Sequence, residues 1–164
     1  MKVRRKDIVF EALGFPIKLI GAPFKNVEGF EVLDINMKKF KEAIFKALIV
    51  KPAPLTGSEL RFMRTHLQLT QKEFSNITKM KNQSSIAQWE KKKDKATGMS
   101  FHVEMGVRAI LAEKVNIKLV IQVVEVLTHE FKQKAPIKPP LFDMKTISIL
   151  KKHKETKTSS RVYN

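Results

Sequence analysis

The chain has 164 residues, a formal net charge of +16, a sequence pI near 10.1 and no cysteine. This length allows one sizeable hydrophobic core or two small ones, and the lack of cysteine excludes disulfides and thiolate metal sites. The charge favours a polyanionic partner, either nucleic acid or an anionic membrane surface, although heavy general use of lysine would give the same balance.

The first fifty residues read as a small β unit followed by a helix. Three short β-prone runs separated by glycine and proline indicate a small sheet, and they lie at residues 8–10, 17–20 and 30–35. Asn36 is placed to cap a helix over residues 37–50. Lys51–Pro54 (KPAP) ends that helix, because proline cannot continue it, and is the best linker candidate in this half of the chain. We therefore expect an α+β N-terminal unit over residues 1–51.

Residues 55–93 read as three short amphipathic helices. Thr56 is placed to cap the first helix, whose apolar residues recur at helical spacing, and Thr70 is placed to cap the second. Asn82 is placed to cap the third, in which Ile86 marks the inward face. Two tight turns joining three such helices in about forty residues are typical of a helix-turn-helix unit.

The outward face of the third helix carries hydrogen-bonding side chains without charge, which are Gln83, Ser84, Ser85 and Gln88. Three lysines follow directly, namely Lys91, Lys92 and Lys93. This pattern suits a helix in a DNA major groove, where amides and hydroxyls reach base edges and lysines contact phosphates. The alternative is a three-helix core element with a solvated face, but such a face normally carries Glu and Lys at i, i+4 spacing.

Three blocks of these helices resemble the Xre, or Cro/CI-type, helix-turn-helix family, and they are Leu60–Arg64 (LRFMR), Leu69–Phe74 (LTQKEF) and Ile86–Glu90 (IAQWE). The resemblance implies a lambda-repressor-like helix-turn-helix bundle over residues 52–116. It also implies a mostly structural ion pair between Arg64 and Glu90. Lys79 departs from the family pattern, because it stands where the turn usually has a glycine.

The same resemblance implies that Gln71 contacts phosphate or base and that the residues opening the third helix read bases. Together with the charge pattern, it gives a set of expected DNA-binding residues. They are Thr70, Gln71, Lys72, Asn82, Gln83, Ser84, Ser85, Gln88, Lys91, Lys92 and Lys93.

The overall layout, a β unit and a helix leading through a proline break into an Xre-type domain, resembles MqsA-like antitoxins and related zinc-finger regulators. In that family the N-terminal unit binds zinc through cysteines and holds a partner toxin. Since this chain has no cysteine, we expect neither a metal site nor a cofactor, and a toxin partner is suggested by the resemblance alone.

The rest of the chain is expected to be helical and then extended. Ser100 is placed to cap a helix over residues 101–115, with an inward face formed by Phe101, Met105, Ile110 and Leu111. Residues 117–134 read as a strongly apolar helix with one polar stripe. It is either a central core helix or, as we favour, a homodimer interface through Val120, Val124 and Leu127. Residues 135–164 are expected to form a Pro-containing linker and a basic tail.

No pattern in the sequence indicates catalysis. The four histidines have no metal-ligand spacing, and they are His66, His102, His129 and His153. There is no glycine-rich phosphate loop and no G-x-S-x-G elbow, so we expect no enzyme. With no signal peptide pattern and no run of eighteen apolar residues, we expect a soluble cytoplasmic protein without a membrane partner.

The expected fold class is mainly α with a small N-terminal β unit and a helix-turn-helix bundle. The expected function is that of a sequence-specific transcriptional regulator, a repressor that binds a double-stranded DNA operator as a homodimer. Two alternatives stay open: an antitoxin that acts mainly by protein binding, and a general basic nucleic-acid-binding protein.

Overall fold

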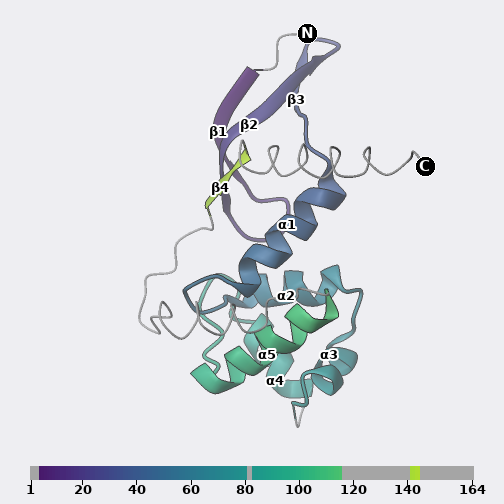
Figure 1. Cartoon of the computed structure of the whole chain (residues 1–164), viewed down its shortest axis with the longest axis vertical. Helices are drawn as coiled ribbons and strands as arrows, with labels where there is room; N and C mark the ends of the chain where they lie inside the picture. Colours follow the sequence, from purple (N-terminus) through teal and green to yellow (C-terminus); the bar gives the residue numbers. More distant parts are fainter. Residues whose placement is uncertain (1–3, 81–82, 116–140, 145–164) are drawn as a thin grey trace, which may run out of the picture. The chain divides into compact units, whose positions relative to one another are not determined.

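The computed structural model describes residues 4–80, 83–115 and 141–144. They form five helices and a three-stranded antiparallel sheet, to which a short parallel strand is added (Figure 1). Contacts divide the chain into two compact units. The first, which we call the sheet unit, comprises residues 1–11, 16–35 and 139–164, and the second, the helical unit, comprises residues 12–15 and 36–138.

The chain is a small α/β protein, so the expected fold class, a mainly α chain built as a lambda-repressor-like bundle, is wrong. The error lies in the length of the strands. Short β-prone runs bounded by glycine and proline were expected to give a minor sheet, whereas β2 continues from Ile17 to Val27 through Gly21 and Pro23. The strands therefore build a unit of their own.

The sheet has the order β1-β2-β3, with β1 at Arg4–Phe10, β2 at Ile17–Val27 and β3 at Phe30–Leu33. A register shift between Lys6 and Ile8 accommodates Gly21, which has a φ of 64° and donates its N–H to the Asp7 carboxylate at 2.8 Å. Glu28 and Gly29, both with positive φ, form the two-residue turn that brings Val27 opposite Phe30.

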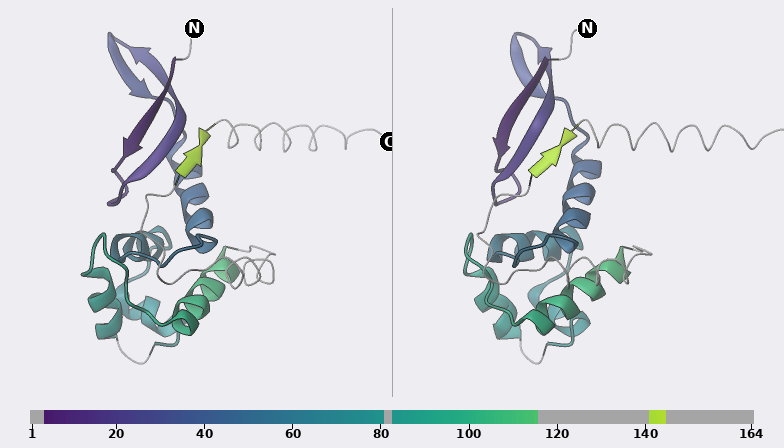
Figure 2. Two further views of the ribbon diagram at one scale, coloured as in Figure 1. Left: turned by 90° about the vertical axis from the view of Figure 1, so that its left-hand side faces the viewer. Right: turned by 60° about the vertical axis from the view of Figure 1, so that its left-hand side comes forward.

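The fourth strand comes from a distant part of the sequence. β4 (Leu141–Asp143) pairs in parallel with Lys18–Ile20 of β2, and Figure 2 shows it beside that strand. These residues were expected to belong to a linker and tail, so that expectation is wrong for this stretch. Three residues are too few for a local pattern, and the strand exists because β2 supplies the hydrogen-bonding partner.

The described part of the helical unit contains five helices: α1 (Met37–Ile49), α2 (Gly57–His66), α3 (Gln71–Ile77), α4 (Gln83–Glu90) and α5 (Phe101–Lys114). Four predicted N-caps are confirmed, since the side chains of Asn36, Thr56, Thr70 and Ser100 each accept a hydrogen bond from a backbone N–H in the first turn. Thr56 and Thr70 also form capping boxes, with Glu59 and Glu73 respectively. Asn82 lies outside the described residues.

Helix α1 clusters with the later helices, whereas residues 1–51 were expected to form one unit. The chain divides between Ile35 and Asn36. The reason is the apolar stripe of α1, since Ile44, Phe45 and Leu48 have no exposed surface and α1 contacts both α2 and α5.

Helix α5 buries a different face from the one expected. Leu111 is fully buried as expected, but Phe101, Met105 and Ile110 are only half-buried. The inward face is instead formed by Glu104, Val107, Arg108, Leu111 and Ala112. The apolar pattern alone therefore predicted the wrong buried face of α5, because the ion pair of Glu104 and Arg108 occupies the centre of the face that packs.

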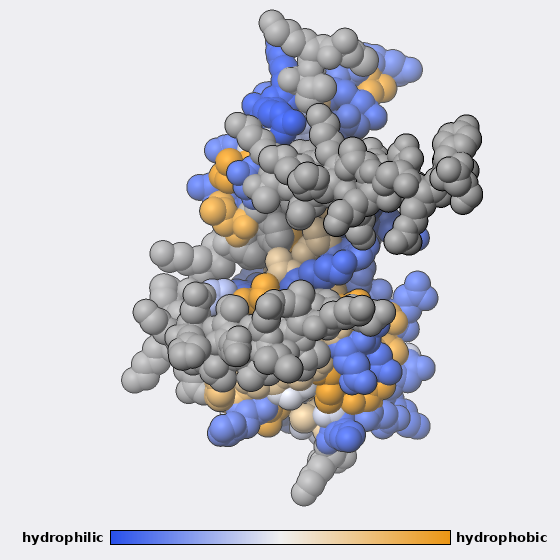
Figure 3. Space-filling view, viewed as in Figure 1, coloured by the Kyte–Doolittle hydropathy of each residue, from blue (hydrophilic) through white to orange (hydrophobic). Residues whose placement is uncertain are grey.

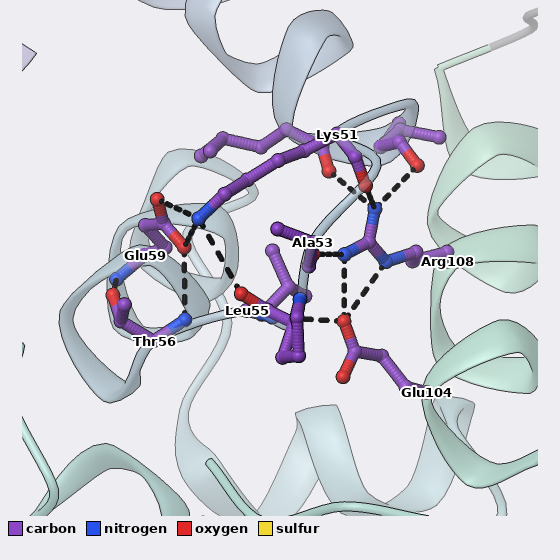
Figure 4. Close-up of polar contacts among 10 residues, drawn as sticks. Lys51, Ala53, Leu55, Thr56, Glu59, Glu104 and Arg108 are labelled. Carbon is purple, nitrogen blue, oxygen red and sulfur yellow. Dashed lines mark hydrogen bonds and ion pairs between the residues drawn. The ribbon is translucent and has the colours of Figure 1, made fainter. Parts of the chain in front are cut away.

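Arg108 is fully buried and binds the segment that was expected to be a linker (Figure 4). Its Nη1 donates to the carbonyls of Leu48, Ile49 and Lys51 at 3.0, 3.0 and 2.7 Å, and its Nη2 donates to that of Ala53 at 2.7 Å. These carbonyls lie at the end of α1 and just beyond it, where backbone acceptors have no helical partner. Lys51–Pro54 is therefore a fixed connection.

Two carboxylates complete this cluster. Glu104 Oε1 accepts from Arg108 Nη2 at 2.6 Å and from the Leu55 N–H at 2.8 Å. Glu59 accepts from Lys51 Nζ at 2.7 Å while closing the capping box of α2. Burial lowers the pKa of Arg108, and the Glu104 carboxylate opposes that shift. The cluster fixes α1, α2 and α5 to one another.

His66 links stability to pH. Its ring lies 5.0 Å from that of Phe45 and 5.7 Å from that of Phe62. Burial lowers its pKa from the ordinary value; the Glu42 carboxylate opposes the shift and Lys41 adds to it.

Because His66 in the unfolded chain binds a proton more readily than in the folded protein, the free energy of unfolding should fall as the pH drops below about 6.5. Urea titrations at pH 5.5 and 7.5 should show this loss in the unmodified protein and a smaller one in His66→Gln. If the unmodified protein and His66→Gln lose the same stability between pH 7.5 and 5.5, other groups cause the pH dependence.

None of the helices among the described residues is long and apolar enough to cross a membrane. The described part of the surface in Figure 3 is largely hydrophilic, with apolar residues in separate patches. The expected apolar helix over residues 117–134, with Val120, Val124 and Leu127, lies outside the part of the chain that the structure describes.

Candidate nucleic-acid interface

Helix α3 is closed at its start by its own capping box. The Thr70 N–H and hydroxyl both donate to the Glu73 carboxylate at 2.7 Å, and the Glu73 N–H donates back to the hydroxyl at 3.2 Å. The bond from the hydroxyl, followed by the one from the backbone, lowers the pKa of Glu73. The Thr70 side chain, an expected DNA contact, is thus used in capping.

The turn after α3 places Lys79 in a backbone conformation that favours glycine. Lys79 has a φ of 53°, in the left-handed region that disfavours residues with a Cβ. Its N–H donates to the Asn76 carbonyl at 3.2 Å, and the Met80 N–H donates to the Ser75 carbonyl at 2.9 Å. This pair of bonds is a Schellman motif with lysine at the left-handed position, and it ends α3 sharply.

The inward side of α4 is held by a bidentate ion pair, the one expected between Arg64 and Glu90. Arg64 Nε and Nη2 donate to the two Glu90 carboxylate oxygens at 2.6 and 3.0 Å, and Arg64 Nη1 donates to the Leu69 carbonyl at 2.6 Å. Together with the fully buried Ile86, this contact fixes the rotation of α4 about its axis.

Gln71 joins the same cluster. Its Nε2 donates to Glu90 Oε2 at 2.9 Å, so the side-chain amide bridges the start of α3 to the end of α4. The amide was expected to contact phosphate or base. In the structure it is half-buried and bound to a carboxylate, which makes it a positioning residue for α4.

The outward side of α4 carries the uncharged polar residues that were expected there. Gln83, Ser84 and Gln88 are exposed, and Ser85 is half-buried. Within the described part of the chain, none of these side chains makes a hydrogen bond to another residue. The side chains of Gln83, Ser84 and Gln88 therefore face solvent on a helix whose other side is fixed.

The backbone that carries the lysines after α4 is fixed, although their side chains are exposed. The Lys91 N–H donates to the Ala87 carbonyl at 3.0 Å, and the Lys93 carbonyl accepts from the Ser58 N–H at 2.9 Å. Lys91, Lys92 and Lys93 are all exposed, as is Lys72 on α3. Exposed ammonium groups of this kind suit phosphate oxygens.

Gly57 holds the start of α2 against the end of α4. A Cβ at this position would lie 2.5 Å from the Trp89 carbonyl oxygen, 2.7 Å from the Lys93 nitrogen and 2.8 Å from the Glu90 carbonyl oxygen. Only a residue without a side chain fits so near these backbone atoms. No apolar or charge pattern in the sequence marks this role, and a glycine directly after an N-cap is the available signal.

Within the ranges 4–80, 83–115 and 141–144, no group of three or more His, Cys, Asp or Glu side chains is arranged to hold a metal ion. No protein-family model matches the sequence, and comparisons with curated proteins and with solved structures found no significant match.

Proposed function

We propose that the protein is a sequence-specific DNA-binding transcriptional regulator without enzymatic activity. It acts in the cytoplasm as a repressor and binds a double-stranded operator as a homodimer. The observation that carries the proposal is the two-sided character of α4, with a buried, ion-paired inner side and an outer side of exposed amides and hydroxyls. The resemblance of α2, α3 and α4 to the Xre helix-turn-helix pattern supports it.

The division of labour on this surface follows from chemistry. A glutamine amide can donate and accept at once, which suits the adenine edge in the major groove, and Gln83 at the start of α4 is the best candidate. Lysines contact phosphates and add affinity without reading sequence, a role for Lys72 and Lys91–Lys93. The Arg64–Glu90 pair and Gln71 set the angle at which α4 meets the groove.

Removing the outward polar groups should reduce selectivity more than affinity. In Gln83→Ala/Ser84→Ala, the preference for the protein's own promoter fragment over a scrambled fragment should fall by about 1–3 kcal/mol, the value of one bidentate base contact. Fluorescence anisotropy with both fragments measures the ratio. His102→Ala, an exposed polar change on α5, is the control and should leave the ratio unchanged. A double variant with the full ratio would contradict the assignment of α4 as the reading helix.

The lysines should act on all sequences alike. Lys92→Ala should weaken binding to promoter and scrambled DNA equally and should reduce the slope of log affinity against log salt by about 0.9, the value of one phosphate contact. Lys114→Ala removes another exposed lysine, at the end of α5, and is the matched control. If both variants lower the slope to the same extent, general attraction by the net charge is responsible, and a general basic nucleic-acid-binding protein becomes the better description.

A further inference from the structure

A cavity of about 650 Å³ lies within the helical unit, and none of its described lining residues belongs to α4. It opens between the first turns of α1 and the last turns of α2, and the loop at residues 12–13 borders it. All of its lining residues belong to the helical unit, and the principal ones are Leu13, Met37, Lys38, Lys41, Phe62 and His66. Its volume falls in the range of small-molecule sites.

One wall of the cavity is aromatic and firmly packed. The rings of Phe62 and His66 are nearly parallel, with centroids 5.7 Å apart and an interplanar angle of 28°. Phe15 packs edge-on against Phe62 at 5.5 Å, and Phe45 supports His66 from a centroid distance of 5.0 Å. A flat apolar group can lie against such a wall without rearranging it.

Two lysines line the cavity beside the aromatic wall. Lys38 and Lys41 are three residues apart on α1, so they share a face of the helix, and both are exposed. None of the described residues that line the cavity is acidic. The nearest carboxylate along the helix, that of Glu42, is bound to Lys46 at 2.6 Å. The two ammonium groups thus border a cavity whose described lining is partly aromatic and partly polar, with Thr65 and Gln68 beside the rings.

We propose that this cavity binds a small molecule with a flat aromatic body and a carboxylate group. The body lies against Phe62 and His66, and the carboxylate is held by Lys38 and Lys41. This inference does not depend on DNA binding, since none of the cavity residues belongs to α3, α4 or the lysines that follow them.

The full chain can be tested by calorimetry with two probes that share a ring system, 2-naphthoate and the uncharged 2-naphthalenemethanol. We expect 2-naphthoate to bind with a stoichiometry of about one and at least about tenfold more tightly than the alcohol. Lys38→Gln/Lys41→Gln should weaken 2-naphthoate about tenfold, because exposed ion pairs are individually weak but two act together here. Lys39→Gln changes an exposed lysine of the same helix that does not line the cavity, and it should bind like the unmodified protein.

Three results would overturn the proposal: no binding of 2-naphthoate, equal binding of the acid and the alcohol, or an equal loss of affinity in the Lys39 and the double variants. The last would mean that the positive net charge attracts anions without a defined site. All three substituted lysines are exposed, so circular dichroism should show unchanged folding and the comparison stays interpretable.

Discussion

Replacing Arg108 with leucine should lower the free energy of unfolding by about 3–5 kcal/mol, the usual cost of removing one partner from a buried ion pair. The change leaves the Glu104 carboxylate buried without a cation and four backbone carbonyls without their donor. Urea titration followed by far-UV circular dichroism measures the loss. Arg61→Leu, an exposed arginine on α2, is the control and should stay within about 0.5 kcal/mol of the unmodified protein.

A second variant separates the ion pair from the backbone contacts. Glu104→Leu/Arg108→Leu removes both charges, and in many proteins such a change is close to neutral. Here it should remain strongly destabilising, because the carbonyls and the Leu55 N–H still lose their partners. If the double variant recovers the stability of the unmodified protein, the carbonyl contacts contribute little and the charge pair alone accounts for the effect.

Gly57→Ala should cost about 3 kcal/mol, at the upper end of the usual range for overpacking. The added carbon would meet three backbone atoms at 2.5–2.8 Å, and backbone atoms cannot move aside as a flexible side chain can. The start of α2 must then separate from the end of α4. Because the same contact positions α4, the proposed DNA binding should weaken in parallel with stability.

Gly106→Ala provides the matched control. Gly106 lies inside α5, and a Cβ there would have no heavy atom within 4 Å. Alanine is the better helix former, so this variant should gain about 0.5–1 kcal/mol. The two substitutions are chemically identical and should have opposite signs in the same urea titration. If both substitutions lower the free energy of unfolding by a similar amount, the close backbone contacts at Gly57 do not cause the loss.

Local features of the sequence predicted the helices well. An N-cap such as Thr56 or Thr70 acts within four residues, so its chemistry is visible in the sequence next to it. The Arg64–Glu90 contact spans 26 residues, and it was reached only through a family pattern. The helical spacing of apolar residues also predicted that Gln83, Ser84 and Gln88 are exposed, because the inward face of a short helix needs only Ile86 and its ion pair.

What the sequence did not reveal depends on distant partners. Arg108 binds carbonyls 55–60 residues earlier in the chain, and no local pattern marks an arginine as buried. Proline in Lys51–Pro54 correctly ended α1, but whether the next residues form a free linker depends on what packs against them. The structural role of Gln71 also depends on a distant partner, because its amide binds the Glu90 carboxylate 19 residues later in the chain.

The hydrogen bonds from Arg108 to the segment Lys51–Pro54 also decide which part of this protein can be transferred to another protein. A segment cut at residue 52 would carry Arg108 without the Leu48, Ile49 and Lys51 carbonyls that it binds. Any evolutionary shuffling event or engineered chimera that transfers the α2–α4 surface to another protein must therefore take α1 with it. The transferable module must include α1 from Asn36 onward, and Lys51–Pro54 is a fixed connection inside it.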